Sequence, residues 1–304
     1  MSYRVLDVLS AALAAVAIPA HALAYPASPA TRAEAPAKRT PLLYANYSGN
    51  TIEIYAQSGQ NQTPIGSISS STLTGVDAMV TDTAGNLYVA NCSSSSDSNV
   101  QVFAPGSQSP SFTYDDTAGC ASDVAVDRDK VVVSNQQAVD GSVTATVFAK
   151  GIASAQYTIH ANSGGQYGTS VALDRHGNCY LASESDASMG GWVSIFHGCA
   201  KNAIPRTYSV LNAEFVFEVR IDRAGDVVLA NFPNLDFYRS PNFAAPINAL
   251  VEAGAPFAFA ADDSTVWTVD AYNTWVIENV RVSDGAILDT ITLKDTENVG
   301  SPAV

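Results

Sequence analysis

A short aspartate-centred unit recurs along the chain, and this repeat constrains the fold more than any other feature of the sequence. Its first complete copy spans residues 81–91 and reads Thr-Asp-Thr-Ala-Gly-Asn-Leu-Tyr-Val-Ala-Asn. Gly and Asn tolerate positive φ in a tight turn, and Leu-Tyr-Val suits a pleated surface, so the unit predicts two antiparallel strands joined by a turn. The aspartate before the turn recurs at intervals of about 45 residues: Asp82, Asp127, Asp174, Asp222 and Asp262.

The spacing of the repeat predicts how these strands assemble. Each aspartate follows an alternating apolar strand, and a third strand follows the hairpin in most copies. A truncated copy stands at residues 43–55, and residues 299–304 resemble the first strand that it lacks. We therefore predict an all-β chain that forms a six-bladed β-propeller over residues 42–304, closed by pairing of its N- and C-terminal segments. An open stack of sheets is the alternative, but it would leave long edges exposed.

The repeat also carries a family resemblance. Gly-Asn-Leu-Tyr-Val-Ala-Asn at residues 85–91, with an apolar-Asp turn before it and Val-x-Val-Phe after it, resembles the NHL-repeat family of six-bladed propellers in its secreted bacterial type. The resemblance covers almost all of residues 42–304. It implies the fold but no single function, because proteins of that architecture include gluconolactonase-like hydrolases, virginiamycin-inactivating lyases, peptide-processing lyases and members that only bind.

The N-terminus predicts an exported protein. Arg4 precedes the apolar run of residues 8–20, and two Ala-x-Ala patterns follow. Residues 1–24 therefore fit a cleaved secretory signal peptide. An uncleaved anchor is the alternative, but the run is too short and interrupted to span a bilayer comfortably, and we expect no stable membrane insertion after cleavage. Residues 25–41, rich in Pro, Ala, Ser and Thr, predict an extended linker. The destination is periplasmic or extracellular.

Charge and cysteines extend this interpretation. The formal net charge of −14 argues against nucleic acid as a partner, because phosphate binding needs Lys and Arg. We interpret the acidity as solubility outside a cell, with attraction of cations or basic partners as the alternative, and we expect a monomer. The four cysteines predict two disulfides, Cys92–Cys120 and Cys179–Cys199, because strand order brings each pair to one place. Free thiols in a reducing compartment are the alternative.

The mouth of the central channel is the expected ligand site, because a concave surface with convergent polar groups is the usual place for a ligand. Polar residues end the second strands and begin the first strands on one face. The candidates are Asn46, Asp77, Asn91, Asp123, Asn135, Ser170, Glu218, Asn231 and Asp270, with Ser183 at the equivalent place in its copy. The alternative is that these Asn side chains bond the backbones of their own loops.

Catalysis finds less support in the sequence. The resemblance implies that a lactonase would hold a divalent cation at the starts of inner strands, but the matching positions are Asp77, Ser122, Thr169, Phe217 and Phe257. With one carboxylate among them, a preformed cation site is not expected. The resemblance also implies that lyases use histidines near the channel, and His160, His176 and His197 show no convergence there. We predict no catalytic residue, metal or cofactor.

Aromatic residues divide into two groups. Tyr44, Tyr88 and Tyr180 share one position of the repeat and are expected in the core between blades. A second group follows the strand-end polar residues, where it would either stack on a sugar or aromatic ligand or pack under loops: Phe232, Phe237, Tyr238, Tyr272 and Trp275.

We predict a non-catalytic binding or scaffold module for a protein, peptide or carbohydrate. A metal-dependent lactonase-like hydrolase or a lyase at the channel mouth is the alternative.

Overall fold

The computed structural model describes residues 41–304, with gaps at residues 49, 58–62, 95–96, 139–141, 162–166, 186–189, 211–215, 261, 271, 273–275 and 294–299. The predicted signal peptide and nearly all of the predicted linker lie outside the described residues. Within the described part, no helix is long and apolar enough to cross a bilayer.

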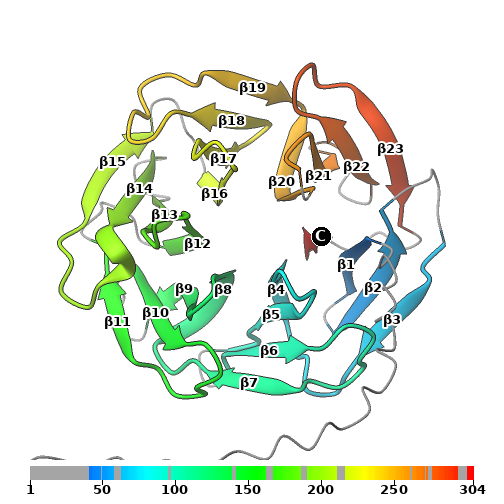
Figure 1. The fold of residues 1–304 in the computed structure, drawn as a ribbon, viewed down its shortest axis with the longest axis horizontal. Coiled ribbons are helices and arrows are strands. Elements are labelled where there is room, and N and C mark those ends of the chain that lie inside the picture. Colours follow the sequence, from blue (N-terminus) through cyan, green and yellow to red (C-terminus); the bar gives the residue numbers. More distant parts are fainter. Residues whose placement is uncertain are drawn as a thin grey trace, which may run out of the picture. The chain divides into compact units, whose positions relative to one another are not determined.

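Six antiparallel sheets of four strands each surround a central axis (Figure 1). In five of them the chain runs outward as a meander from the strand nearest the axis. The second sheet contains β4 (Val76–Thr81), β5 (Leu87–Asn91), β6 (Asn99–Phe103) and β7 (Phe112–Asp115). The third contains β8 (Gly119–Val126), β9 (Lys130–Ala138), β10 (Thr144–Ala149) and β11 (Tyr157–His160). The fourth contains β12 (Tyr167–Leu173), β13 (Cys179–Ser185), β14 (Gly190–Phe196) and β15 (Arg206–Val210), with the short 3-10 helix η1 (His197–Cys199) between the last two.

The remaining sheets repeat this pattern, and the first sheet contains strands from both ends of the described chain. The fifth contains β16 (Val216–Ile221), β17 (Val227–Asn231), β18 (Asn234–Tyr238) and β19 (Asn248–Val251). The sixth contains β20 (Ala253–Phe259), β21 (Thr265–Asp270), β22 (Val276–Arg281) and β23 (Ile287–Thr292). The first contains β24 (Gly300–Ala303), β1 (Leu42–Ser48), β2 (Thr51–Ala56) and β3 (Gly66–Ser69). In the first sheet β24 pairs antiparallel with β1, at Tyr44 with Ala303 and at Asn46 with Gly300. The prediction of an all-β, six-bladed propeller is confirmed.

The recurring aspartate organises the turn between the first two strands of a sheet. The Asp82 carboxylate accepts hydrogen bonds from the backbone N–H groups of Ala84 and Asn86, at 3.0 and 2.9 Å. Gly85 closes the turn at φ 81°, a conformation that side chains disfavour, and its N–H donates to the Asp82 carbonyl. The same arrangement recurs around Asp174 and Asp222. The repeat therefore reflects a turn that is built locally.

The hydrophobic core lies between sheets. Each of six buried clusters draws its residues mainly from two neighbouring sheets. Tyr44, Tyr88 and Tyr180 are buried in three of these clusters, as the repeat predicts. Each sheet buries apolar side chains on both faces, so it needs a neighbouring sheet on each side. Sheets that surround a common axis meet this requirement.

Both predicted disulfides are confirmed. Cys92 and Cys120 join the end of β5 to β8 of the next sheet, with Cα atoms 5.5 Å apart. Cys179 and Cys199 join β13 to η1 within one sheet, with Cα atoms 5.1 Å apart. Two disulfides indicate an oxidising compartment, of the kind that exported proteins reach.

Candidate functional site

The strands that line the central channel share a bulge. In β4, β8, β12 and β16 the pairing register shifts at one equivalent residue, which is Asp77, Ser122, Thr169 or Phe217, and β8 shifts a second time at Cys120. A bulge leaves one residue without a paired partner and re-aims its side chain. Ser122 Oγ donates to the Gly168 carbonyl at 3.0 Å, and Thr169 Oγ1 donates to the Val216 carbonyl at 2.8 Å. Two of the four bulges therefore link one blade to the next.

Asp77 differs from those two residues, because its carboxylate has no hydrogen bond among the described residues. The residue is exposed at the surface, and partial loss of hydration next to the protein raises the pKa of its carboxyl group to about 7. Asp77 is therefore a carboxyl group on an inner strand whose pKa lies nearer neutral pH than that of an ordinary aspartate.

Arg220 lies at the centre of a buried ionic cluster that links three blades. It extends from β16, and its guanidinium donates to both oxygens of Asp123 on β8, at 2.7 and 3.2 Å. It also forms an ion pair with Glu218 on its own strand and donates to Ser170 Oγ of β12 at 3.3 Å. Burial raises the pKa of Glu218, although the guanidinium beside it favours the ionised form. The cluster fixes the relative positions of three inner strands.

The same polar side chains also satisfy backbone groups of the channel wall. Inner strands are sheet edges, so some of their N–H groups have no strand partner and need another acceptor. A side chain from the preceding blade supplies it in three cases: Asp123 Oδ2 accepts from Val171 at 3.1 Å, Ser170 Oγ from Val219 at 3.0 Å, and Glu218 Oε2 from Phe257 at 2.7 Å. Three of the predicted ligand-face residues therefore bridge neighbouring blades.

The polar residues at the ends of the second strands hold nearby backbone and side chains. Asn91 Oδ1 accepts from the N–H groups of Thr74 and Gly75, at 2.7 and 3.1 Å. The other bonds are Asn46 Nδ2 to the Val76 carbonyl at 2.9 Å, Asn135 Nδ2 to Thr146 Oγ1 at 3.1 Å, Asn231 Nδ2 to Asp236 Oδ2 at 2.9 Å, and the Tyr272 N–H to Asp270 Oδ1 at 2.8 Å. Ser183 is fully buried. Asn46 and Asn91 thus bond backbone groups of other segments, and Asn135 and Asn231 bond side chains, so these amides are engaged within the protein.

The aromatic residues that follow the strand ends separate into buried and exposed sets. Phe237 and Tyr238, expected on a loop, instead belong to β18 and are buried in the core, so that part of the prediction is wrong. The chain turns back at once after Asn231, which places them in a strand. Phe232 and Tyr272 are 49% and 68% exposed, and their ring centroids lie 6.2 Å apart at 71°. Trp275 lies outside the described residues.

Phe217, the bulge residue of β16, is also exposed at this end of the sheets, at 42%. The polar set mostly bonds the protein, and the aromatic set reaches solvent over the fifth and sixth sheets. Exposed, clustered aromatic side chains are typical of binding surfaces.

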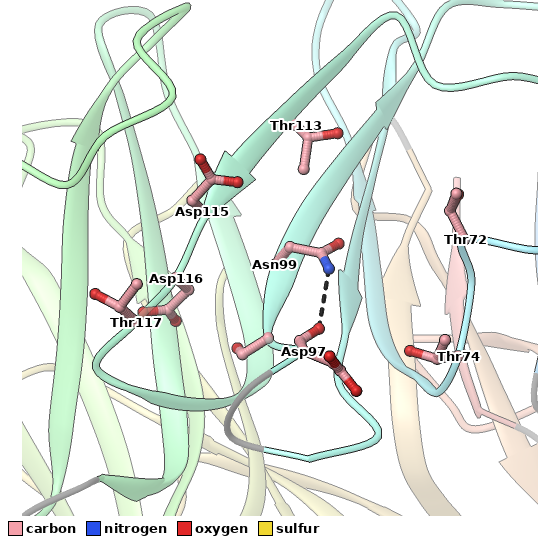
Figure 2. A pocket seen from close by; sticks show the side chains of 9 residues that line it. Thr72, Thr74, Asp97, Asn99, Thr113, Asp115, Asp116 and Thr117 are labelled. Carbon is pink, nitrogen blue, oxygen red and sulfur yellow. Dashed lines mark hydrogen bonds between the residues drawn. The ribbon is translucent and has the colours of Figure 1, made fainter.

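A separate cavity of about 540 Å³ opens on the second sheet. Figure 2 shows its lining residues: Asp115, Asp116 and Thr117 on one side, Thr72 and Thr74 on the other, and Asp97, Asn99 and Thr113 between them, with Ser98 completing the set. Asp97 and Asp115 are exposed, and Asp116 is 2% exposed. The nine lining residues include three carboxylates and no basic side chain.

Arg220 and Asp116 are the residues that sequence reasoning missed. Arg220 lies in the first strand of its repeat, where the other copies have Val80, Ala125 and Ala172. A charged residue in an otherwise apolar strand was therefore the signal that could have identified it. Asp116 lies between two strands and outside the repeated pattern, so no signal distinguished it.

The three histidines named in the sequence analysis lie at the surface. His160, His176 and His197 are all exposed. Among the residues that the structure describes, no group of three or more His, Cys, Asp or Glu side chains is placed to hold a metal ion.

Comparison with known proteins supports the fold alone. A chain of a nidogen/laminin complex aligns with a TM-score of 0.66 and 11% identity, over 86% of this chain and 97% of that one. A protein of unknown function from Bacteroides caccae aligns with a TM-score of 0.65 and 10% identity, over 87% and 98%. The WD40 β-propeller domain of Doa1 aligns with a TM-score of 0.56 and 12% identity, over 83% and 79%. No protein-family model and no curated protein matches the chain.

Proposed function

We propose that the protein is an exported, non-catalytic binding or scaffold propeller of the NHL-repeat type, which takes a peptide, protein or carbohydrate on its channel-mouth face. The exposed Phe232–Tyr272 pair carries this proposal. Phe232 follows β17 and Tyr272 follows β21, so the two rings come from neighbouring sheets and meet above the boundary between them. Two exposed aromatic rings held in contact offer an apolar surface at small cost in side-chain entropy.

The location of the pair supports a ligand near the channel. Phe232 directly follows Asn231 and Tyr272 comes two residues after Asp270, and both polar residues belong to the predicted ring. The Asp270 carboxylate accepts the Tyr272 N–H at 2.8 Å, which fixes the backbone below the exposed ring. Phe217 extends the apolar surface toward the inner strand β16. A sugar face or an aromatic side chain fits such a surface.

A panel of oligosaccharides and aromatic peptides, immobilised and probed with the purified protein, tests the proposal. The double variant Phe232→Ala/Tyr272→Ala should weaken capture at least about tenfold, which corresponds to the loss of a well-packed aromatic contact. Ile287→Ala, which removes an exposed apolar side chain of the outermost strand β23, is the matched control. Equal capture by wild type and the double variant would contradict the proposal.

Export is tested separately from binding. Expression of the full chain in a secreting bacterium, followed by N-terminal sequencing, should give a mature protein that begins at residue 25. An intact N-terminus in the membrane fraction would favour the uncleaved anchor.

A metal-dependent hydrolase or a lyase at the channel mouth is the second candidate, and Asp77 is the observation that favours it. A carboxyl group with a pKa of about 7 is suited to proton transfer at neutral pH. Assays with lactone substrates, with and without added Ca²⁺ or Zn²⁺, should compare wild type with Asp77→Asn. Turnover that this substitution abolishes would replace the binding proposal, whereas turnover that persists would exclude Asp77 as the base.

A further inference from the structure

We infer that the surface around the Phe232–Tyr272 pair binds arginine side chains of a partner polypeptide. This inference rests on the function proposed above and narrows its ligand from a peptide, protein or carbohydrate to one chemistry. Three features of the fifth and sixth sheets carry it: the exposed rings, the carboxylates beside them, and the positions of the basic residues of these sheets.

The two rings present open faces to solvent. Phe232 and Tyr272 are 49% and 68% exposed, and their planes meet at 71° with the centroids 6.2 Å apart. In such an edge-to-face pair one ring directs its edge at the other, so its own faces stay uncovered by that contact. The face of an aromatic ring is electron-rich and attracts a cation held within about 6 Å of its centroid. The pair therefore suits a flat cationic group.

Two carboxylates of the sixth sheet lie on the side that faces the fifth sheet. Asp270 and Thr268 alternate with Val266 on one face of β21, and Val266 packs against residues of the fifth sheet. Glu278 of β22 pairs with Thr268, so its side chain shares that face. Both carboxylates are thus directed toward the sheet from which Phe232 extends.

Glu252 adds a third carboxylate at the same place. It directly precedes Ala253, which pairs with Asp270, and it is exposed, whereas Glu278 is partly buried. Loss of hydration raises the pKa of Glu278, and the negative charges of Asp270 and Glu252 raise it further. Within the described residues, neither glutamate accepts a hydrogen bond or forms an ion pair. Like charges this close favour a cation beside them.

The basic side chains of these two sheets lie elsewhere. Residues 216–292 contain four of them, all arginines. Arg220 is held in the buried cluster of the inner strands. The other three lie in or beside the turns at the opposite end of the sheets: Arg223, Arg239 and Arg281. Two of these already form ion pairs there, Arg239 with Asp226 at 3.5 Å and Arg281 with Asp284 at 2.8 Å. None of the four is therefore placed to neutralise the carboxylates beside Tyr272.

An arginine side chain satisfies both halves of this surface. Its guanidinium is planar, stacks on aromatic faces and donates two parallel hydrogen bonds to a carboxylate. A lysine ammonium is compact and strongly hydrated, so it gains less from the rings. A neutral sugar would contact the rings without using the carboxylates, and an anion would be repelled by them. A metal ion needs several oxygen ligands around one point, and the carboxylates of the described residues form no such group.

Fluorescence anisotropy with labelled peptides, at low salt and about pH 7.5, tests the inference on the exported protein. The probe is Gly-Arg-Gly-Arg-Gly. The same peptide with citrulline in place of arginine keeps the shape of the side chain and removes its charge, and it should bind at least about tenfold more weakly. The lysine version should bind severalfold more weakly than the arginine version, because it does not stack.

Two pairs of substitutions locate the site. Glu252→Gln/Glu278→Gln removes two charges beside the rings without removing any hydrogen bond described above, and it should weaken binding of the arginine peptide about tenfold. Asp262→Asn/Asp284→Asn makes the same change in net charge in turns at the opposite end of the sixth sheet. This control should leave the affinity within about twofold, because solvent and salt screen distant charges.

The outcomes separate this inference from the function on which it rests. If the citrulline peptide or the lysine peptide binds as tightly as the arginine peptide, the assignment to arginine is overturned. If oligosaccharides or neutral aromatic peptides are captured, and Phe232→Ala/Tyr272→Ala abolishes that capture while arginine gives no gain, the proposed function stands and this inference falls. If neither these ligands nor the arginine peptide binds, both are overturned.

Discussion

Replacement of Arg220 by methionine should destabilise the propeller strongly. The guanidinium contacts two carboxylates whose side chains are only 2% and 6% exposed, those of Asp123 and Glu218. Methionine fills similar space but leaves both carboxylates buried without a counter-charge. Loss of one partner from a buried ion pair costs about 3–5 kcal/mol, a large part of the roughly 5–15 kcal/mol that stabilises a typical domain.

The loss should depend on pH in a defined direction. Burial already raises the pKa of Glu218 in the wild type, and removal of the guanidinium takes away the main influence that lowers it. A carboxyl group whose folded-state pKa exceeds its unfolded value stabilises the fold at low pH and loses that contribution as pH rises through the folded pKa. Arg220→Met should therefore be most unstable above neutral pH and recover partly toward about pH 5.

Urea unfolding followed by tryptophan fluorescence and far-UV circular dichroism measures this effect. The triple variant Asp123→Asn/Glu218→Gln/Arg220→Met, which buries no charge, should regain much of the lost free energy, because a polar network without charge avoids the desolvation penalty. Arg281→Met breaks an exposed pair with Asp284 at 2.8 Å and should leave the urea midpoint close to that of the wild type. If Arg220→Met unfolds at the wild-type urea concentration at every pH, the cluster does not hold the blades together.

Three further predictions concern other parts of the fold. Cys92→Ser/Cys120→Ser removes a crosslink of sequence separation 28 and should cost about 3–4 kcal/mol by loop entropy; an unchanged urea midpoint under oxidising conditions would contradict this. Deletion of residues 300–304 removes β24, whose Ala303 is buried against β1, and should cost at least about 2 kcal/mol and speed proteolysis; wild-type resistance to protease would show that the pairing does not close the ring. Burial raises the pKa of Asp116 to about 6 from 3.8. The contribution of its carboxyl group to the free energy of unfolding is therefore fully present below about pH 4 and falls by about 3 kcal/mol as pH rises through 6. Asp116→Asn should remove that part of the pH dependence, and an unaltered plot of unfolding free energy against pH would contradict the raised pKa.

Local features of the sequence determined most of the architecture. The turn around Asp82 and Gly85 is closed by contacts within a few residues, so its recurrence could be found without knowledge of the fold. Alternating apolar residues set which strands pack on both faces, and strand order placed Cys179 near Cys199. These inferences need only the spacing of the repeat and the order of its strands, and both can be found in the sequence directly.

The candidate sites were decided by tertiary structure, because they depend on which blades meet and on what becomes buried. Arg220 and Asp123 are 97 residues apart, and no local pattern shows that they share a channel. Phe237 and Tyr238 were misplaced because the loop before them is shorter than the repeat predicted. Asp116 reads in the sequence as an ordinary loop aspartate. Its unpaired oxygen exists only because the third sheet and the disulfide-bonded loop enclose it. Periodicity fixes the order of strands, but the burial of a charge is set by residues distant in the chain.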